Sequence, residues 1–334
     1  MQSTVRPLKA LMPTPSSPDV GDYCTRPVGR SESIDSTDTC TDSTTSEADG
    51  LDGSARGCDD KAVVVLTTSE LQPLENVADE VAAMRRALQN HDWVVQYGAI
   101  ETLRRAIVHH TEATLASIDQ DVLRRLQDAT LNLRSAMSKN ALAALAECFE
   151  FAPDELAALD VAPVVESILN RAACEKKFLR DAADCALVKL ATCVPTHRVL
   201  AALASVASSK NNKLCVAGCS STVLCLQTMK ARQATLADHE STNVLIRQLV
   251  AFRGGKDAKT RDDALAALCV VRDLVGGADV FDAMVAKAVS SKAVAFKVAS
   301  DTKIAPSGRL RPKASSRPTG SLRENVRLNR ATVE

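Results

Sequence analysis

The chain has 334 residues, long enough for a sizeable core, and 46% of them are hydrophobic and 25% charged, as in folded globular proteins. Its 41 basic and 41 acidic residues cancel, so its overall charge does not favour general binding to nucleic acid or another polyanion. Aromatic residues make up only 3% of the chain, fewer than strand-rich folds use. No apolar run approaches the ~20 residues of a membrane-spanning helix. The composition therefore predicts a soluble, all-α, intracellular protein without a membrane partner.

The eleven cysteines are an odd number and include no CxxC pair, which argues against a disulfide framework and against a zinc site. Most of them lie in apolar, helix-like stretches, where a thiol behaves as a small hydrophobic group. We expect these to be reduced core thiols of a cytosolic protein: Cys148, Cys185, Cys193, Cys219, Cys225 and Cys269. The first residues lack the apolar segment of a secretory signal.

Residues 1–70 are predicted to be a disordered, acidic tail. Between positions 31 and 60 there are eleven Ser or Thr residues, nine acidic residues, one basic residue and no aromatic residue. Such a segment cannot bury enough apolar surface to offset the entropy lost on ordering. Lys61–Thr68 is a lone β-like run, for which docking on the following domain is one interpretation.

Residues 71–301 are predicted to form a six-repeat α-solenoid of the HEAT or armadillo kind. Apolar residues recur at helical spacing, for example in Ser138–Phe151 and in Thr260–Val275, where Thr260 has the position of an N-terminal cap. Pro163 suits the first turn of another helix. Alternate breaks in this pattern divide the region into six helical pairs about 40 residues apart. The first helices are expected to begin near positions 75, 119, 160, 196, 241 and 277.

Residues 302–334 are predicted to be a second disordered tail, of opposite charge. They contain eight Lys or Arg residues against two Glu residues, and three prolines interrupt any helix. Two interpretations remain open. The tail is either a basic arm that binds an acidic surface or a solvated end without a partner.

In stacked helical pairs, the turns within pairs lie on one edge and the turns between pairs lie on the other. The turns between pairs are mainly acidic, whereas those within pairs carry ten basic residues against three acidic ones. This segregation favours a basic edge that faces an acidic partner. Trp93, the single tryptophan, lies at the first turn within a pair, where we expect an exposed interface anchor. The ten bases are Arg134, Lys139, Lys176, Lys177, Lys210, Lys213, Lys256, Lys259, Arg261 and Lys292.

Two stretches of the chain resemble a known family. LRSAMSKNALAAL (Leu133–Leu145) and FLRDAADCAL (Phe178–Leu187) are similar to the second and third repeats of TOG domains, nearest to those of CLASP and crescerin proteins. The resemblance extends over about residues 75–300, and Trp93 matches the tryptophan of the first TOG loop. It implies that this edge binds αβ-tubulin or microtubules in the cytoplasm and cytoskeleton, with the cilium or axoneme as one site.

The resemblance also implies a set of tubulin-binding residues, one group for each loop. Trp93 would be an apolar anchor on β-tubulin, and the other residues would meet acidic tubulin surface. The expected contacts are Trp93 in loop one; Arg134, Ser135 and Lys139 in loop two; Lys176 and Lys177 in loop three; Lys210 and Asn211 in loop four; and Lys256 and Lys259 in loop five.

The chain departs from the family pattern in two loops. Gln96 stands where the family often has Arg, and Leu214 and Cys215 stand where it usually has a Val-Arg pair. One solenoid also argues against a processive polymerase, because family members of that kind use arrays. Of the matching residues, Phe178 and Leu179 are expected in the core, and Arg180 and Asp181 are expected to pair with neighbouring helices.

Two other classes of function compete with tubulin binding. A generic helical-repeat scaffold would bind a non-tubulin partner in the concave groove of its second helices, and the loop edge would then be dispensable. A solenoid enzyme, such as a DNA glycosylase, would need aromatic clamps and a catalytic acid, and the aromatic content speaks against it. No nucleotide-binding, hydrolase or metalloprotease motif is present, and the five histidines are dispersed. We expect no enzymatic activity, no cofactor, no metal site and no nucleic-acid partner.

Overall fold

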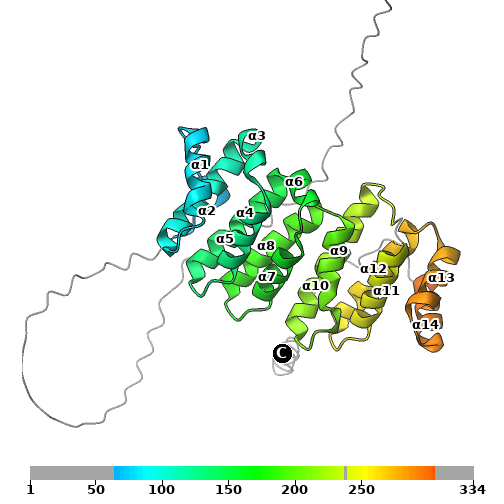
Figure 1. Ribbon diagram of the computed structural model, residues 1–334. Coiled ribbons are helices and arrows are strands. Elements are labelled where there is room, and N and C mark those ends of the chain that lie inside the picture. Colours follow the sequence, from blue (N-terminus) through cyan, green and yellow to red (C-terminus); the bar gives the residue numbers. More distant parts are fainter. Residues whose placement is uncertain (1–63, 237–238, 305–334) are drawn as a thin grey trace, which may run out of the picture. The chain divides into compact units, whose positions relative to one another are not determined.

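The computed structural model describes residues 64–236 and 239–304, with His239 and Ile304 described by their backbone alone (Figure 1). These residues belong to one compact unit that begins at Val63. The predicted disorder of residues 1–63 and 305–334 lies outside the described residues. The predictions for residues 64–70 and 302–304 are addressed below.

Six antiparallel helical pairs make up this unit, as the sequence predicts. Each first helix begins within two residues of its expected position, and the sequence did not indicate the short helices between pairs. The first helices are α1 (Val77–Ala87), α4 (Gln120–Thr130), α7 (Ala162–Ala172), α9 (His197–Ala204), α11 (His239–Arg253) and α13 (Ala278–Ala288). The second helices are α2 (Trp93–His109), α5 (Ser135–Phe151), α8 (Lys177–Cys193), α10 (Asn212–Ala231), α12 (Ala258–Leu274) and α14 (Lys292–Ile304). The short helices are α3 (Thr111–Thr114) and α6 (Pro153–Ala158), with 3-10 turns η1 (Thr68–Glu70), η2 (Leu115–Ser117) and η3 (Ser205–Ser208).

The helices form two layers. From α2 to α14 each second helix packs on the next, and from α4 to α13 the first helices do the same. The turns within pairs therefore follow one edge of the unit, the lower edge in Figure 1, while α3 and α6 lie along the opposite edge. We call the first of these the loop edge. It comprises residues 88–92, 131–134, 173–176, 209–211, 254–257 and 289–291 with the first turn of each following helix.

Small side chains let the second helices approach closely. In α5 and α8 the fully buried positions include Ala141, Ala144, Ala183 and Ala186, beside buried leucines on the same faces. Alanine is also the strongest helix former, so the same residues favour the helices and their packing. The low aromatic content is thus a property of a core built from Ala and Leu.

Polar residues at the turns start several of the helices. Asp92, Asp119, Thr196, Asn211 and Asp257 each accept a hydrogen bond from a backbone N–H in the first turn of the helix that follows. The prediction that Thr260 caps a helix is wrong, because α12 begins at Ala258 and Asp257 is its cap. The Asp257 carboxylate accepts hydrogen bonds from the backbone N–H and the hydroxyl of Thr260, which is buried. Pro163 lies in the first turn of α7, as expected.

A close approach of α10 to η3 requires glycine at position 218. A Cβ atom there would lie 2.4 Å from Cγ2 of Val206 and 2.8 Å from the carbonyl oxygen of Leu203. We expect Gly218→Ala to lower the free energy of unfolding by about 2 kcal/mol, because the backbone around Leu203 must move. Gly98→Ala in α2 is the matched control: a Cβ atom added there would meet no atom within 4 Å, so the better helix former should stabilise the protein slightly. Urea unfolding followed by circular dichroism compares the two, and equal stability of Gly218→Ala and wild type would contradict the packing described.

Within residues 64–236 and 239–304, α10 is the one helix long and apolar enough to cross a membrane by length and composition alone. The sequence did not single it out. Half of its apolar window is buried in the solenoid, where it packs between α8 and α12. We therefore interpret α10 as a core helix of the solenoid.

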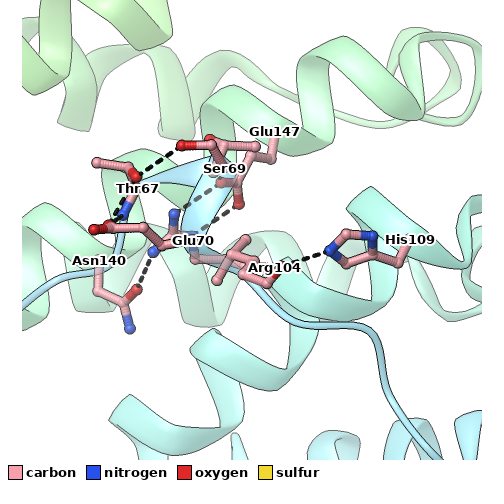
Figure 2. A network of polar contacts seen from close by, with 9 residues as sticks. Thr67, Ser69, Glu70, Arg104, His109, Asn140 and Glu147 are labelled. Carbon is pink, nitrogen blue, oxygen red and sulfur yellow. Dashed lines mark hydrogen bonds and ion pairs between the residues drawn. The ribbon is translucent and has the colours of Figure 1, made fainter. Parts of the chain in front are cut away.

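An N-terminal segment, residues 64–76, runs along α2 before α1 begins. Its Leu71 and Leu74 side chains are buried, and its Thr68 donates a hydrogen bond of 2.8 Å to the Glu147 carboxylate on α5. The His109 ring donates to the carbonyl oxygen of Leu71 at 2.8 Å (Figure 2). Residues 64–70, placed in the tail by their sequence, thus contact the helical domain, and the described part of the β-like run docks. At the other end, α14 continues to Ile304, beyond the expected limit at 301.

The N-terminal segment covers a buried ion pair that joins the first two repeats. Arg104 on α2 donates from Nε and Nη2 to the two carboxylate oxygens of Glu147 on α5, each at 2.8 Å (Figure 2). Its Nη1 donates to the Asn140 side chain at 3.1 Å. Arg104 and Glu147 are 1% and 2% exposed, so the pair lies in the core. Its further hydrogen bonds are made with other protein side chains, those of Asn140 and Thr68.

Candidate functional site

The first loop of the loop edge presents Trp93 as a half-buried ring. Asp92 caps α2, so Trp93 is the first residue of the helix and its side chain packs partly against the core. The guanidinium carbon of Arg134, from the second loop, lies 4.7 Å from the ring centroid, a cation–π contact. The ring is therefore less exposed than expected of an exposed anchor, because it packs partly against the core and Arg134 stacks on it.

The second, third and fourth loops are joined by side-chain contacts. Lys176 Nζ donates to Ser135 Oγ at 2.6 Å, and Lys213 Nζ lies 2.8 Å from a Glu175 carboxylate oxygen. The hydrogen bond from Lys213 lowers the pKa of the Glu175 carboxyl group. Arg171, behind these loops, donates to the carbonyl oxygens of residues 130 and 132. Four successive loops thus form one continuous surface, because each contacts the next.

The other expected contact residues differ in exposure and in whether their side chains form ion pairs. Lys210 and Lys256 are exposed, and among the described residues their side chains have no hydrogen bond or ion pair. Lys177 pairs with Asp181 at 2.8 Å, and Lys259 lies 3.9 Å from Asp263. Lys139 is half-buried in the second turn of α5.

Asn211 has a structural role in its loop. Its Oδ1 accepts hydrogen bonds from the backbone N–H groups of Lys213 and Leu214 and so caps α10. The two departures from the family pattern also organise their loops. Gln96 donates to the carbonyl oxygen of Asn90 at 2.6 Å, which closes loop one, and the Cys215 thiol donates to the carbonyl oxygen of Ser209 at 3.3 Å, which closes loop four.

Exposed apolar side chains interleave with the bases on the loop edge, and sequence reasoning missed them. Val94, Leu133 and Phe178 are 56%, 96% and 45% exposed. The expectation of a core Phe178 is wrong, whereas Leu179 is buried at 2% as expected. Because α8 begins at Lys177, Leu179 starts the buried face of the helix and Phe178 lies outside that face. The helical spacing of the apolar residues after Leu179 could have predicted that Phe178 is exposed.

The pairing expected for Arg180 and Asp181 is also wrong. Arg180 donates to the carbonyl oxygens of Cys174 and Glu175 in the preceding loop, and Asp181 pairs with Lys177 on its own helix. Both residues therefore stabilise the start of α8 and loop three. Among residues 64–236 and 239–304, no hydrogen bond or ion pair joins either of them to a neighbouring helical pair.

The composition of this surface is suited to contact with another protein. It combines exposed apolar groups with basic groups held on a rigid scaffold, an arrangement that suits an acidic protein surface with apolar pockets. No group of three His, Cys, Asp or Glu residues able to hold a metal occurs in the described part of the chain. A cavity beneath loops one and two, lined by Gln96, Arg125 and Asn132, measures about 80 Å³. That is less than the ~150 Å³ of a cavity that holds benzene.

Three buried thiols of the second helices α5 and α10 are not activated. Burial raises the pKa of the Cys148, Cys219 and Cys225 thiols to about 12, so they stay protonated at neutral pH. Cys148, Cys219, Cys225 and Cys269 are buried as expected, whereas Cys185 and Cys193 are half-buried.

Fold and surface together define a helical-repeat binding protein, an α-solenoid with an apolar and basic loop edge. The chain belongs to the CLASP N-terminal family, whose model matches residues 77–261. This membership confirms the resemblance to TOG-domain proteins.

Three solved structures of similar fold are distant in sequence. One, described as "TOG-tubulin binding specificity promotes microtubule dynamics and mitotic spindle formation", is 16% identical with a TM-score of 0.46, covering 72% of this chain and 92% of its own. The MAST/Orbit N-terminal domain is 16% identical with a TM-score of 0.45, covering 70% and 98%. A crescerin TOG structure is 13% identical with a TM-score of 0.44, covering 72% and 92%. Among proteins of curated function, none matches the chain.

Proposed function

We propose that this protein binds αβ-tubulin or microtubules through its loop edge and so regulates the microtubule cytoskeleton. The observation that carries the proposal is the continuity of loops one to four. Trp93 lies under Arg134, Ser135 accepts a hydrogen bond from Lys176, and Glu175 pairs with Lys213. Contacts of this kind hold the recognition groups in place before a partner arrives, which reduces the entropy lost on binding.

The composition of the loop edge supports an acidic protein partner over the competing classes of function. Exposed apolar side chains, among them Val94, Leu133 and Phe178, interrupt the bases, and phosphate backbones offer no pockets for such groups. Aromatic platforms for single-stranded bases are also scarce, since Trp93 is half-buried beneath Arg134. We therefore propose no nucleic-acid partner, no membrane partner and no catalytic activity. The protein would act on the cytoskeleton in the cytoplasm, and the cilium or axoneme is one place where it would bind microtubules.

Charge reversal at two exposed lysines tests this proposal. We expect Lys210→Glu/Lys256→Glu to weaken binding of the full chain to αβ-tubulin by about tenfold or more, because two attractive contacts become repulsive. The fold should be unchanged, since neither side chain has a partner among the described residues. Fluorescence titration at two salt concentrations measures the affinity, and the variant should also lose part of the salt dependence.

The matched control makes the same change of charge away from the loop edge. Arg198→Glu/Arg247→Glu alters two exposed arginines on the first helices α9 and α11, and we expect near wild-type affinity. If the two double variants bind tubulin equally well, the loop edge is not the binding surface. The alternative, a scaffold that binds a non-tubulin partner along its second helices, would then be favoured.

A further inference from the structure

The N-terminal segment brings the start of the described chain to the loop edge. The hydroxyl of Tyr97 lies 3.4 Å from the carbonyl oxygen of Val64 and donates to it. Tyr97 is one helical turn after Trp93 on α2, or about 6 Å along the helix axis. Val64 is 75% exposed, and its contact with Tyr97 places it at the end of α2 that begins with Trp93.

This position is held by several independent contacts. Thr68 is hydrogen-bonded to the buried Glu147, and Leu71 and Leu74 are 3% and 5% exposed. Arg105 donates to the carbonyl oxygens of Gln72 and Pro73 at 2.8 and 2.9 Å. Residues 64–74 are therefore held in place along α2 by contacts at both ends of the segment.

The sequence immediately before this point is strongly acidic. Residues 31–60 carry nine carboxylates and one arginine, and the last two of these carboxylates are Asp59 and Asp60. We infer that the acidic segment, residues 31–60, binds the loop edge of its own chain and competes there with the acidic partner. The intrachain contact follows from charge and connectivity alone, whereas the competition rests on the proposed function.

The acidic segment is long enough to reach the whole edge. Asp60 precedes Val64 by about four residue lengths, so its carboxylate can lie up to ~14 Å from Val64. Adjacent helices lie ~10 Å apart, so five successive loops extend over ~40 Å. About twelve extended residues cover that distance. Asp52 can therefore reach loop five, and linkage in one chain keeps the local concentration of carboxylates high.

Carbodiimide cross-linking of the full chain, without tubulin, tests the intrachain contact. This reagent joins a carboxylate to a lysine amine only when the two are in contact, and mass spectrometry identifies the linked residues. We expect links from carboxylates of the acidic segment to Lys176, Lys210 and Lys256, and we expect them to disappear at high salt. Links that join the acidic segment only to Lys303 or Lys313 would overturn the inference. So would the absence of links to the loop edge at low salt.

A second measurement tests the competition. A full-chain variant with the nine acids replaced by their amides should bind αβ-tubulin about tenfold more tightly than wild type, as expected if the edge is occupied nine-tenths of the time. A variant with the same segment in shuffled order should keep wild-type affinity, because net charge governs the contact. Equal affinity of the amide variant and wild type would refute the competition. Failure of every form to bind tubulin would refute the proposed function instead, while the cross-links still decide the intrachain contact.

Discussion

Replacement of Arg104 by methionine is expected to lower the free energy of unfolding by about 3–5 kcal/mol. The substitution leaves the Glu147 carboxylate buried at 2% exposure without its cation, and an uncompensated buried charge is costly. It also removes the donor to Asn140 and loosens the N-terminal segment, which Thr68 attaches to the same carboxylate. Urea unfolding measures the loss. The double variant Arg104→Met/Glu147→Met should recover part of it, because it removes both charges.

The control is an ion pair in the same layer of helices but at the surface. Lys189 on α8 lies 2.6 Å from Glu150 on α5, and both side chains are about one-third exposed, at 32% and 38%. Lys189→Gln should therefore change the free energy of unfolding by less than about 1 kcal/mol. Similar losses for Arg104→Met and Lys189→Gln would contradict the assignment of the Arg104–Glu147 pair to the core.

Removal of the Trp93 ring is expected to weaken tubulin binding by about tenfold or more, or about 1.4 kcal/mol. Trp93→Ala deletes an apolar contact surface and the ring on which the Arg134 guanidinium stacks, so two adjacent recognition groups are lost together. Isothermal titration of the full chain with αβ-tubulin measures the change. Because Trp93 also packs against the core, the variant's unfolding curve must be recorded beside its affinity.

Val280→Ala provides the comparison for Trp93→Ala. Val280 is 40% exposed in the first turn of α13, at the edge opposite to the loop edge. Its truncation should leave the tubulin affinity unchanged. A folded Trp93→Ala protein with wild-type affinity would exclude loop one from the binding surface.

The helical pairs were predictable because their boundaries are set locally. Asp92 and Asn211 cap the helices after them, Pro163 starts α7, and the apolar stripe has the period of a helix. Each of these signals lies within a few residues of the boundary that it sets. The cap of α12 was misplaced by three residues because Thr260 and Asp257 both have suitable side chains, and only the buried position of Thr260 decides between them.

The contacts of the loop edge were less predictable because they join residues about 40 positions apart. Their positions in predicted turns placed Arg134 and Lys176 on this edge, but their contacts with Trp93 and Ser135 depend on the spacing of stacked helices. The sequence did not single out Arg104, which stands beside Arg105 and is buried. Its partner, Glu147, stands between Ala146 and Cys148 in α5, and an acid with apolar neighbours is a local signal of a buried pair.

The most direct test of the central claim is size-exclusion chromatography of the full chain with unpolymerised αβ-tubulin at low and at physiological salt. The account predicts a complex that elutes before either protein alone and that diminishes as the salt concentration rises. The variant with amides in place of the nine acids is run in parallel, so that occupation of the edge by the acidic segment cannot hide binding. Absence of a complex for both proteins at low salt would contradict the claim that the loop edge binds tubulin.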